Sequence, residues 1–500
     1  MLLLTQDAAH SGASELVSTG FDSPITALQA ARRRAQESAA AKGHAQELAI
    51  FVTGSRSGEL ALVHPDAAHE AWTTTPWPAQ HKDAHTATVT TVCALEEDGN
   101  TVAAAGQDSS SFLVVTGSAD GLVKIWRVQT STAEQAWTVS LLQVISAELK
   151  GALPLCAQLI SLPSQSGNGS SGHLLALAVT KSFVQLYVHD SSSDSVAPST
   201  STSVQHTKFR LALQLSGHED WVRALSLARV SSSELVLASG GQDNYVRLWR
   251  IARLSQPGVT GQTGEAIAPK KTGDVQDDED FIEKLMSKIE LGDGEAQGGA
   301  ASSSRAGTSF SANSRAFTLG SGTDRDTWLV TLDALLVGHD GWITSLRWHP
   351  ALLSSQGATL QPAALLSTSA DNSVIVWAPA ATAPDKYVNL GSTDAASSIW
   401  APQQRFGELG GGTSLGFYGS VWAVPSRLDI VQDSSTYYSP LGVFCHAYNG
   451  ATRLWAPTLP SDEAATSIGR WSPRSAITGH LGKCKSINWD PTGSMLLSCG

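Results

Sequence analysis

The feature of the sequence that most constrains the fold is a spacing that recurs along the chain. An Asp or Asn is followed six positions later by a Trp, and the stretch between them is β-prone. The copies are Asp120 to Trp126, Asp243 to Trp249, Asp371 to Trp377 and Asn449 to Trp455. Each turn reads Asp-Gly, Asp-Asn or Asn-Gly, which is typical of a tight turn between antiparallel strands. The repetition predicts an array of similar β-hairpins rather than a set of unrelated domains.

A second element accompanies these hairpins. It is a His with apolar residues four and seven positions later, and it occurs at His85, His218, His339 and His480. The order of His, strand, Asp turn and strand ending in Trp resembles the WD40 repeat family. The resemblance implies an all-β propeller, in which the His, the Asp, a strand Ser or Thr and the Trp form a hydrogen-bonded chain within each blade. These residues are therefore expected to be structural.

Weaker copies extend the pattern, and together they predict a seven-bladed WD40 β-propeller over residues 49–500, with low-complexity insertions. The blades are expected to end near residues 63, 126, 187, 249, 377 and 455, followed by an unfinished blade at 471–500. Ser498-Cys499-Gly500 aligns with Ser239-Gly240-Gly241, which places the next turn Asp beyond residue 500. We therefore expect an incomplete last blade and a chain that is a fragment of a longer protein.

Two regions depart from the repeat. Within residues 1–48, Ser14–Gly20 is strand-like and is our candidate for a strand that closes the propeller. Gln29–Gln46 is Ala-rich with three consecutive Arg at 32–34, and it is expected to be a solvated helix or loop, with a binding patch as the alternative. Residues 252–334 are rich in Gly, Ser, Thr and Ala, and we expect a disordered insertion because such a composition buries little apolar surface.

The insertion contains an acidic segment at residues 274–295, with nine acidic residues against two lysines, in a chain whose net charge is −12. Within it, Phe281, Leu285 and Ile289 fall on one face of a helix. This face is a candidate partner contact. The alternatives are packing on the chain's own propeller and a solvated stretch.

Composition and motifs exclude several classes of protein. No run of about 18 apolar residues and no signal-peptide core is present, so we expect no membrane span and a cytoplasmic location, or a cytoplasmic and nuclear one. The five Cys are scattered without a C-x-x-C pair, which fits a reduced chain without a zinc ribbon. Metal-binding His pairs, nucleophile elbows and carboxylate constellations are also missing. We expect no catalytic site, no cofactor and no metal.

Two of the Trp residues outside the hairpins stand at equivalent positions of the repeat. Trp221 and Trp342 each follow a repeat His by three positions, where the first strand of a blade is expected to leave the rim. Trp is favoured at the energetic centres of interfaces, so both are candidate partner contacts. The alternative is packing against the next blade.

One region goes beyond the generic repeat. Residues 398–411 (SIWAPQQRFGELGG), 416–419 (GFYG) and 447–455 (AYNGATRLW), with 217–223 and 338–346, resemble the WD40 family of second subunits of the Elongator complex. The resemblance implies the first of two tandem propellers of a noncatalytic scaffold, in a complex that modifies wobble uridines of tRNA. The implied partners are the large first subunit and the radical-SAM acetyltransferase subunit, with tRNA contacted indirectly.

A substrate-recruiting WD40 adaptor, for example of a ubiquitin ligase, is the alternative. It would read short peptides over the central channel, and Arg or Lys on the top-face turns would favour it. Those turns carry Ala119, Gln242 and Ala370. An enzyme on the propeller would need convergent carboxylates at the channel, whereas the Asp residues are committed to turns.

Overall fold

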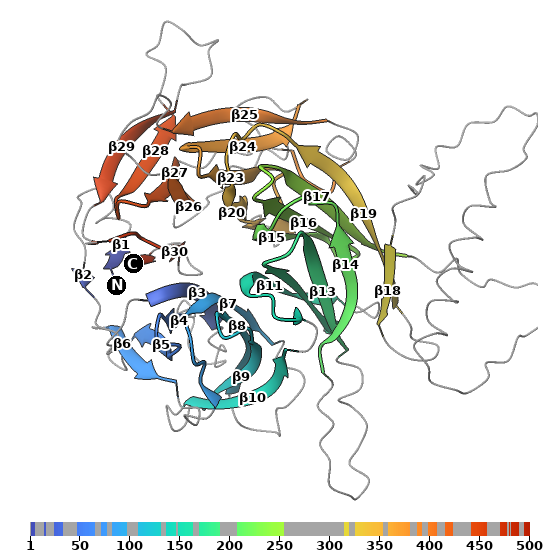
Figure 1. Ribbon diagram of the computed structural model, residues 1–500, viewed down its shortest axis with the longest axis vertical. Helices are drawn as coiled ribbons and strands as arrows, with labels where there is room; N and C mark the ends of the chain where they lie inside the picture. Colours follow the sequence, from blue (N-terminus) through green and yellow to red (C-terminus); the bar gives the residue numbers. More distant parts are fainter. Residues whose placement is uncertain are drawn as a thin grey trace, which may run out of the picture.

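The computed structural model consists of strands and the turns between them, with no α-helix among the residues it describes (Figure 1). The described residues are 2–5, 15–16, 25–33, 48–65, 72–77, 83–97, 109–131, 137–146, 149–163, 170–190, 208–254, 315–319, 326–353, 359–380, 388–392, 399–407, 416–423, 442–457, 471–477, 480, 482–489 and 495–500.

The first half of the chain forms three antiparallel four-stranded blades of consecutive strands. Blade 1 is β3 (Ile25–Arg33), β4 (Leu48–Ser55), β5 (Leu60–Pro65) and β6 (Trp72–Pro76). Blade 2 is β7 (Val89–Glu96), β8 (Ser109–Ser118), β9 (Val123–Ser131) and β10 (Trp137–Ile145). Blade 3 is β11 (Pro154–Pro163), β12 (Ser170–Val179), β13 (Phe183–Asp190) and β14 (Arg210–Ser216).

Three further blades follow the same plan. Blade 4 is β15 (Val222–Ser231), β16 (Glu234–Gly241), β17 (Val246–Arg253) and β19 (Asp326–Leu336), with β18 (Arg315–Leu319) as an outer fifth strand. Blade 5 is β20 (Ile343–Trp348), β23 (Leu365–Ser369), β24 (Ser373–Pro379) and β25 (Trp400–Gly407), with the separate hairpin β21 (Leu352–Leu353) and β22 (Thr359–Leu360) inserted. Blade 6 is β26 (Phe417–Ala423), β27 (Gly442–Ala447), β28 (Thr452–Pro457) and β29 (Trp471–Ile477).

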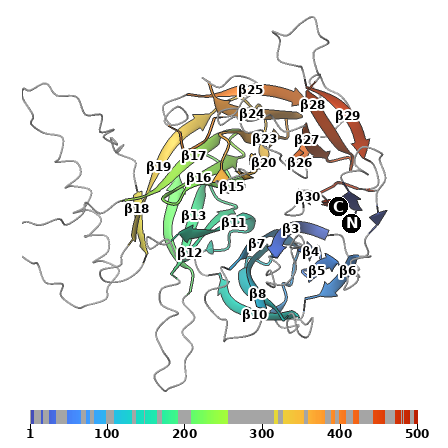
Figure 2. The ribbon, with the colours of Figure 1, turned by 180° about the vertical axis from the view of Figure 1, so that it is seen from behind.

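A closing sheet joins the two ends of the chain. Its order is β2 (Glu15–Leu16), β1 (Leu2–Thr5), β31 (Met495–Cys499) and β30 (Ser486–Trp489). β1 pairs antiparallel with β31, with Leu3 opposite Leu497. The blades follow one another around a central opening, and the two termini lie side by side between blade 6 and blade 1 (Figures 1 and 2).

The turn chemistry explains why the hairpins fold where the sequence predicts them. The residue after each turn Asp or Asn has a positive φ, with Gly121 at 79°, Asn244 at 68°, Asn372 at 65° and Gly450 at 83°. Gly and Asn tolerate this left-handed conformation better than other residues, and it matches the twist of the flanking strands.

Apolar clusters lie between neighbouring blades. One cluster joins Leu248 of blade 4 to Ile343 and Leu365 of blade 5, and another joins Phe444 of blade 6 to Leu496 of the closing sheet. Burying one such side chain contributes roughly 1.5–3 kcal/mol. Because each cluster needs two sheets, a blade does not bury its own apolar face alone.

The predicted blade count is wrong as stated. The all-β WD40 propeller is present, but six blades of consecutive strands are found rather than seven, and the C-terminal strands do not form an unfinished blade of their own. β30 and β31 are completed by the N-terminal strands β1 and β2. The prediction rested on the repeat residues near the C-terminal end of the sequence. The short strand Leu2–Thr5 contains no repeat residue that would indicate its pairing with β31.

The predicted N-terminal segment also needs correction. The strand that pairs with the C-terminal sheet is β1, whereas Glu15–Leu16 pairs with β1 alone. The Ala-rich stretch expected to be a helix or loop contributes to β3, the inner strand of blade 1. Ala and Arg favour helices locally, but pairing with β4 overrides this weak preference.

The predicted insertion at 252–334 is too long at both ends. Arg253 belongs to β17, and residues 315–319 and 326–334 lie in β18 and β19. Trp328 is fully buried in β19 and explains why this stretch is ordered despite its composition. Residues 255–314, including Phe281, Leu285 and Ile289, lie outside the described residues.

Candidate functional site

The repeat residues form a hydrogen-bonded chain within blade 4. The Nε1–H of Trp249 donates to Ser239 Oγ over 3.0 Å. The same hydroxyl lies 2.9 Å from His218 Nε2, and His218 Nδ1 lies 2.8 Å from an Asp243 carboxylate oxygen. Matching chains occur in blade 2 (His85, Asp120, Thr116 and Trp126) and in blade 5 (His339, Asp371, Ser367 and Trp377).

Each of these hydrogen-bonded chains ends on an Asp carboxylate that is held in its ionised form. Burial by itself would raise the pKa of Asp243, but the hydrogen bonds from His218 and from the N–H groups of Glu219 and Tyr245 outweigh burial and lower it to about 2. The same balance lowers the pKa of Asp120 and Asp371. These polar groups are therefore occupied in holding the blades together.

Three other predicted repeat residues are not joined in this way. Asn449 is exposed, and its side-chain oxygen accepts a hydrogen bond from the Ala451 N–H over 3.1 Å. Trp455 is buried, but its Nε1–H has no partner among the described residues. His480 Nε2 lies 2.9 Å from Ser498 Oγ in the closing sheet. The structure places these residues in blade 6 and the closing sheet without connecting them to one another.

The central channel contains a cavity of about 330 Å³. Its lining comes from the inner strands of all six blades and of the closing sheet, namely β3, β7, β11, β15, β20, β26 and β30. The channel is therefore the place where residues far apart in the sequence meet.

A β-bulge near the start of five of the inner strands aims a side chain into this cavity. The pairing register shifts by one residue in β7, β11, β15, β20 and β26. The residues skipped by these shifts are Thr90, Leu155, Arg223, Thr344 and Tyr418, and all five line the cavity. A bulge leaves one residue out of the ladder and re-aims its side chain.

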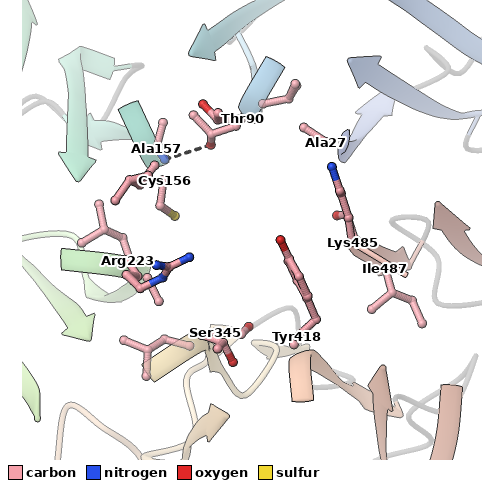
Figure 3. Close-up of a pocket in the computed structure, with 18 of the residues that line it drawn as sticks. Ala27, Thr90, Cys156, Ala157, Arg223, Ser345, Tyr418, Lys485 and Ile487 are labelled. Atoms are coloured by element: carbon pink, nitrogen blue, oxygen red, sulfur yellow. Dashed lines mark hydrogen bonds between the residues drawn. The ribbon is translucent and has the colours of Figure 1, made fainter. Parts of the chain in front are cut away.

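Arg223, Tyr418 and Lys485 point into the cavity from different sides (Figure 3). Arg223 and Tyr418 occupy bulge positions in blades 4 and 6, and Lys485 immediately precedes β30. Arg347 from β20 also lines the cavity. We call Arg223, Arg347 and Lys485 the channel cations.

The two predicted rim residues lie next to this group. Trp221 and Trp342 are 44% and 50% exposed. Their backbones are fixed, because the Trp221 carbonyl accepts the Gln242 N–H over 2.8 Å and the Trp342 carbonyl accepts the Ala370 N–H over 2.9 Å. Both residues are therefore partly exposed at the rim, and their role as partner contacts stays a prediction.

The channel cations were missed by the sequence reasoning, although a signal existed. Arg223 and Lys485 each stand five positions after a repeat His, directly after the apolar residues Val222 and Cys484. The sequence-based expectation of basic residues concerned only the turns that carry the repeat Asp. Tyr418 and Arg347 follow no such rule, because blade 6 has no repeat His and Arg347 lies deeper in its strand.

Within the described part of the chain, no group of three His, Cys, Asp or Glu side chains is placed to hold a metal ion. No helix in that part is long and apolar enough to cross a membrane.

Comparisons with known proteins identify the repeat and its relatives. A family model described as WD domain, G-beta repeat matches residues 78–127, 209–250, 331–378 and 471–500. Elongator complex protein 2 of Dictyostelium discoideum is 27% identical over 78% of this chain and 36% of its own length. The proteins of the same name from Drosophila melanogaster (27%, over 80% and 38%) and Mus musculus (26%, over 77% and 33%) are similar to the same extent.

The chain thus spans about a third of the length of these relatives. The family model falls on blades 2, 4 and 5 and the closing sheet, which carry the repeat His residues. The chain is a WD40-repeat β-propeller whose sequence is similar to Elongator complex protein 2 over more than three quarters of its length.

Proposed function

We propose that this chain is the propeller part of a noncatalytic scaffold subunit of an Elongator complex, and that it supports tRNA wobble-uridine modification by organising partner subunits. The observation that carries the proposal is the similarity to Elongator complex protein 2 from several organisms. A propeller suits this role because its blades form a rigid frame whose loops vary independently. The Asp carboxylates of the repeat support a noncatalytic role, because in blades 2, 4 and 5 each is hydrogen-bonded to the repeat His of its own blade.

The rim residues Trp221 and Trp342 are the proposed partner contacts. Exposed Trp rings on fixed backbones make good anchors, because little conformational entropy is lost when a partner covers them. The backbone of each is already held by a turn of its own blade. The partners proposed are the large first subunit and the radical-SAM acetyltransferase subunit, with tRNA contacted through them.

Co-purification from native cells tests both parts of the proposal. The full-length protein carries Trp221→Ser and Trp342→Ser together, and the expected result is a loss of at least one Elongator subunit from the purified complex. Ile399→Ser is the matched control. Ile399 is 82% exposed, and its carbonyl accepts the Ala380 N–H at the opposite end of β24 from Trp342.

The outcomes separate the two parts. A wild-type protein that purifies alone from native cells would overturn the scaffold role. A double variant that keeps every subunit would overturn the rim assignment and leave the scaffold role standing. The level of modified wobble uridine in tRNA from cells with the double variant is expected to fall with the loss of the subunit, and unchanged modification despite that loss would contradict the tRNA part.

A further inference from the structure

The central cavity has an unusual charge pattern. Its lining includes the three channel cations and no carboxylate, although the whole chain has a net charge of −12. Arg223 comes from blade 4, Arg347 from blade 5 and Lys485 from the start of the closing sheet. Three cations from three sheets therefore surround one space.

The channel cations are not neutralised by the chain itself. Among the described residues, no carboxylate forms an ion pair with any of them. The Nε–H of Arg347 is buried and has no hydrogen-bond partner in the described part of the chain. Around Lys485, burial and the neighbouring charges of Lys483 and Arg56 lower its pKa. The site lacks negative charge.

Neutral donors complete the lining. Ser345, Tyr418 and Tyr448 also line the cavity, and each carries a hydroxyl group that can donate a hydrogen bond. Burial and the neighbouring Tyr448 raise the pKa of Tyr418 despite the opposing charge of Arg223, so its hydroxyl stays protonated and donates. A cavity lined by three cations and several hydroxyl donors but no carboxylate suits a ligand made of acceptors with negative charge.

We propose that the channel binds a small oligophosphate, a compact anion with two or more linked phosphate groups. Arginine forks match phosphate oxygens in a bidentate manner, and a lysine adds a point charge. The cavity of about 330 Å³ lies at the lower end of the range for small-molecule sites. Arg223 and Lys485 enter the cavity from different sides (Figure 3), so an anion with several linked phosphate groups can offer a separate group to each, whereas a single phosphate cannot.

Calorimetric titration of the full chain with tripolyphosphate in a phosphate-free buffer tests the proposal. Arg223→Gln and Lys485→Gln are each expected to weaken binding at least tenfold. Lys208→Gln is the matched control, because it removes one positive charge from an exposed residue that does not line the cavity. Melting temperatures of the three variants close to that of the wild type show that folding is intact.

Two further ligands identify the kind of anion. Citrate, a compact polycarboxylate, and a singly phosphorylated acidic peptide are titrated under the same conditions. Tripolyphosphate is expected to bind more tightly than either. The proposal is overturned if tripolyphosphate does not bind, if Lys208→Gln weakens it as much as the channel variants do, if citrate binds as tightly, or if the peptide binds more tightly, the last of which would make the channel a peptide site.

Discussion

The guanidinium of Arg223 lies over the indole ring of Trp342, with 5.6 Å between its Cζ atom and the ring centroid, although the two residues belong to neighbouring blades. Arg223 lines the cavity and Trp342 is half exposed on the rim. The contact therefore links the proposed partner surface to the proposed anion site.

Trp342→Ala is expected to weaken tripolyphosphate binding about two- to fivefold. The reason is that a cation–π contact of about 0.5–1 kcal/mol no longer holds Arg223 in place. Titration calorimetry measures the change. Trp221→Ala is the control, since the described residues show no cation stacked on Trp221. Equal losses in the two variants would show that the stack does not position Arg223.

Asp243→Ala is expected to lower the free energy of unfolding by about 3 kcal/mol, because it leaves buried His218 and Arg247 without their shared anion. Urea denaturation monitored by tryptophan fluorescence gives the value. Glu219→Ala, at an exposed residue whose side chain accepts none of these bonds, is expected to change it by less than about 0.5 kcal/mol. A similar small effect for Asp243→Ala would contradict a structural role.

Acid is expected to destabilise the blades through the same residue. The pKa of Asp243 falls from 3.8 to about 2 on folding, so the unfolded chain binds more protons as the pH drops through this window. The stabilisation is therefore complete above about pH 5 and is lost as the pH falls towards 2. Urea denaturation from pH 6 to 2 should show that the difference between wild type and Asp243→Asn shrinks, and a constant difference would argue against this linkage.

Trp377→Phe is expected to cost about 1 kcal/mol more than Trp455→Phe. Both changes remove similar volume from buried positions, but only Trp377 donates a hydrogen bond, to Ser367 Oγ over 2.7 Å. Denaturant unfolding of the two variants isolates the value of this bond. Equal costs would mean that the repeat hydrogen bond adds nothing beyond packing.

Leu3→Pro is expected to destabilise the ring by about 3 kcal/mol. Leu3 pairs with Leu497 on one side and Glu15 on the other, and proline removes the N–H that such pairing uses. Leu3→Ala keeps that N–H and serves as the control for the side chain. Thermal unfolding compares the two, and a proline variant as stable as the alanine variant would show that β1 does not hold the ring closed.

The sequence predicted the parts of the fold that carry a residue-specific signal. His218, Asp243 and Trp249 can be read from spacing, because each is needed for one hydrogen-bonded chain. β19 and β3 carry no such residue. They form because they pair with β17 and β4, and neither the low-complexity composition around β19 nor the Ala-rich composition of β3 indicates this pairing.

The candidate site was harder to predict for a related reason. The position of Arg223 in the channel depends on a β-bulge, which is a property of strand pairing rather than of a motif. Tyr418 takes the same position in a blade without the repeat His. Only the ring geometry shows that these residues face one another.

The closing sheet has a consequence for how the chain folds during synthesis. β1 is synthesised before its partner β31, and all six blades lie between the two strands in the sequence. Contacts of such long sequence separation form late, because their loop-closure entropy must first be offset by the blades between them. Each blade can pack on its neighbour as it emerges from the ribosome, whereas β1 finds its partner only after β31 has been made. Closure is therefore expected to be the rate-limiting step in forming the ring.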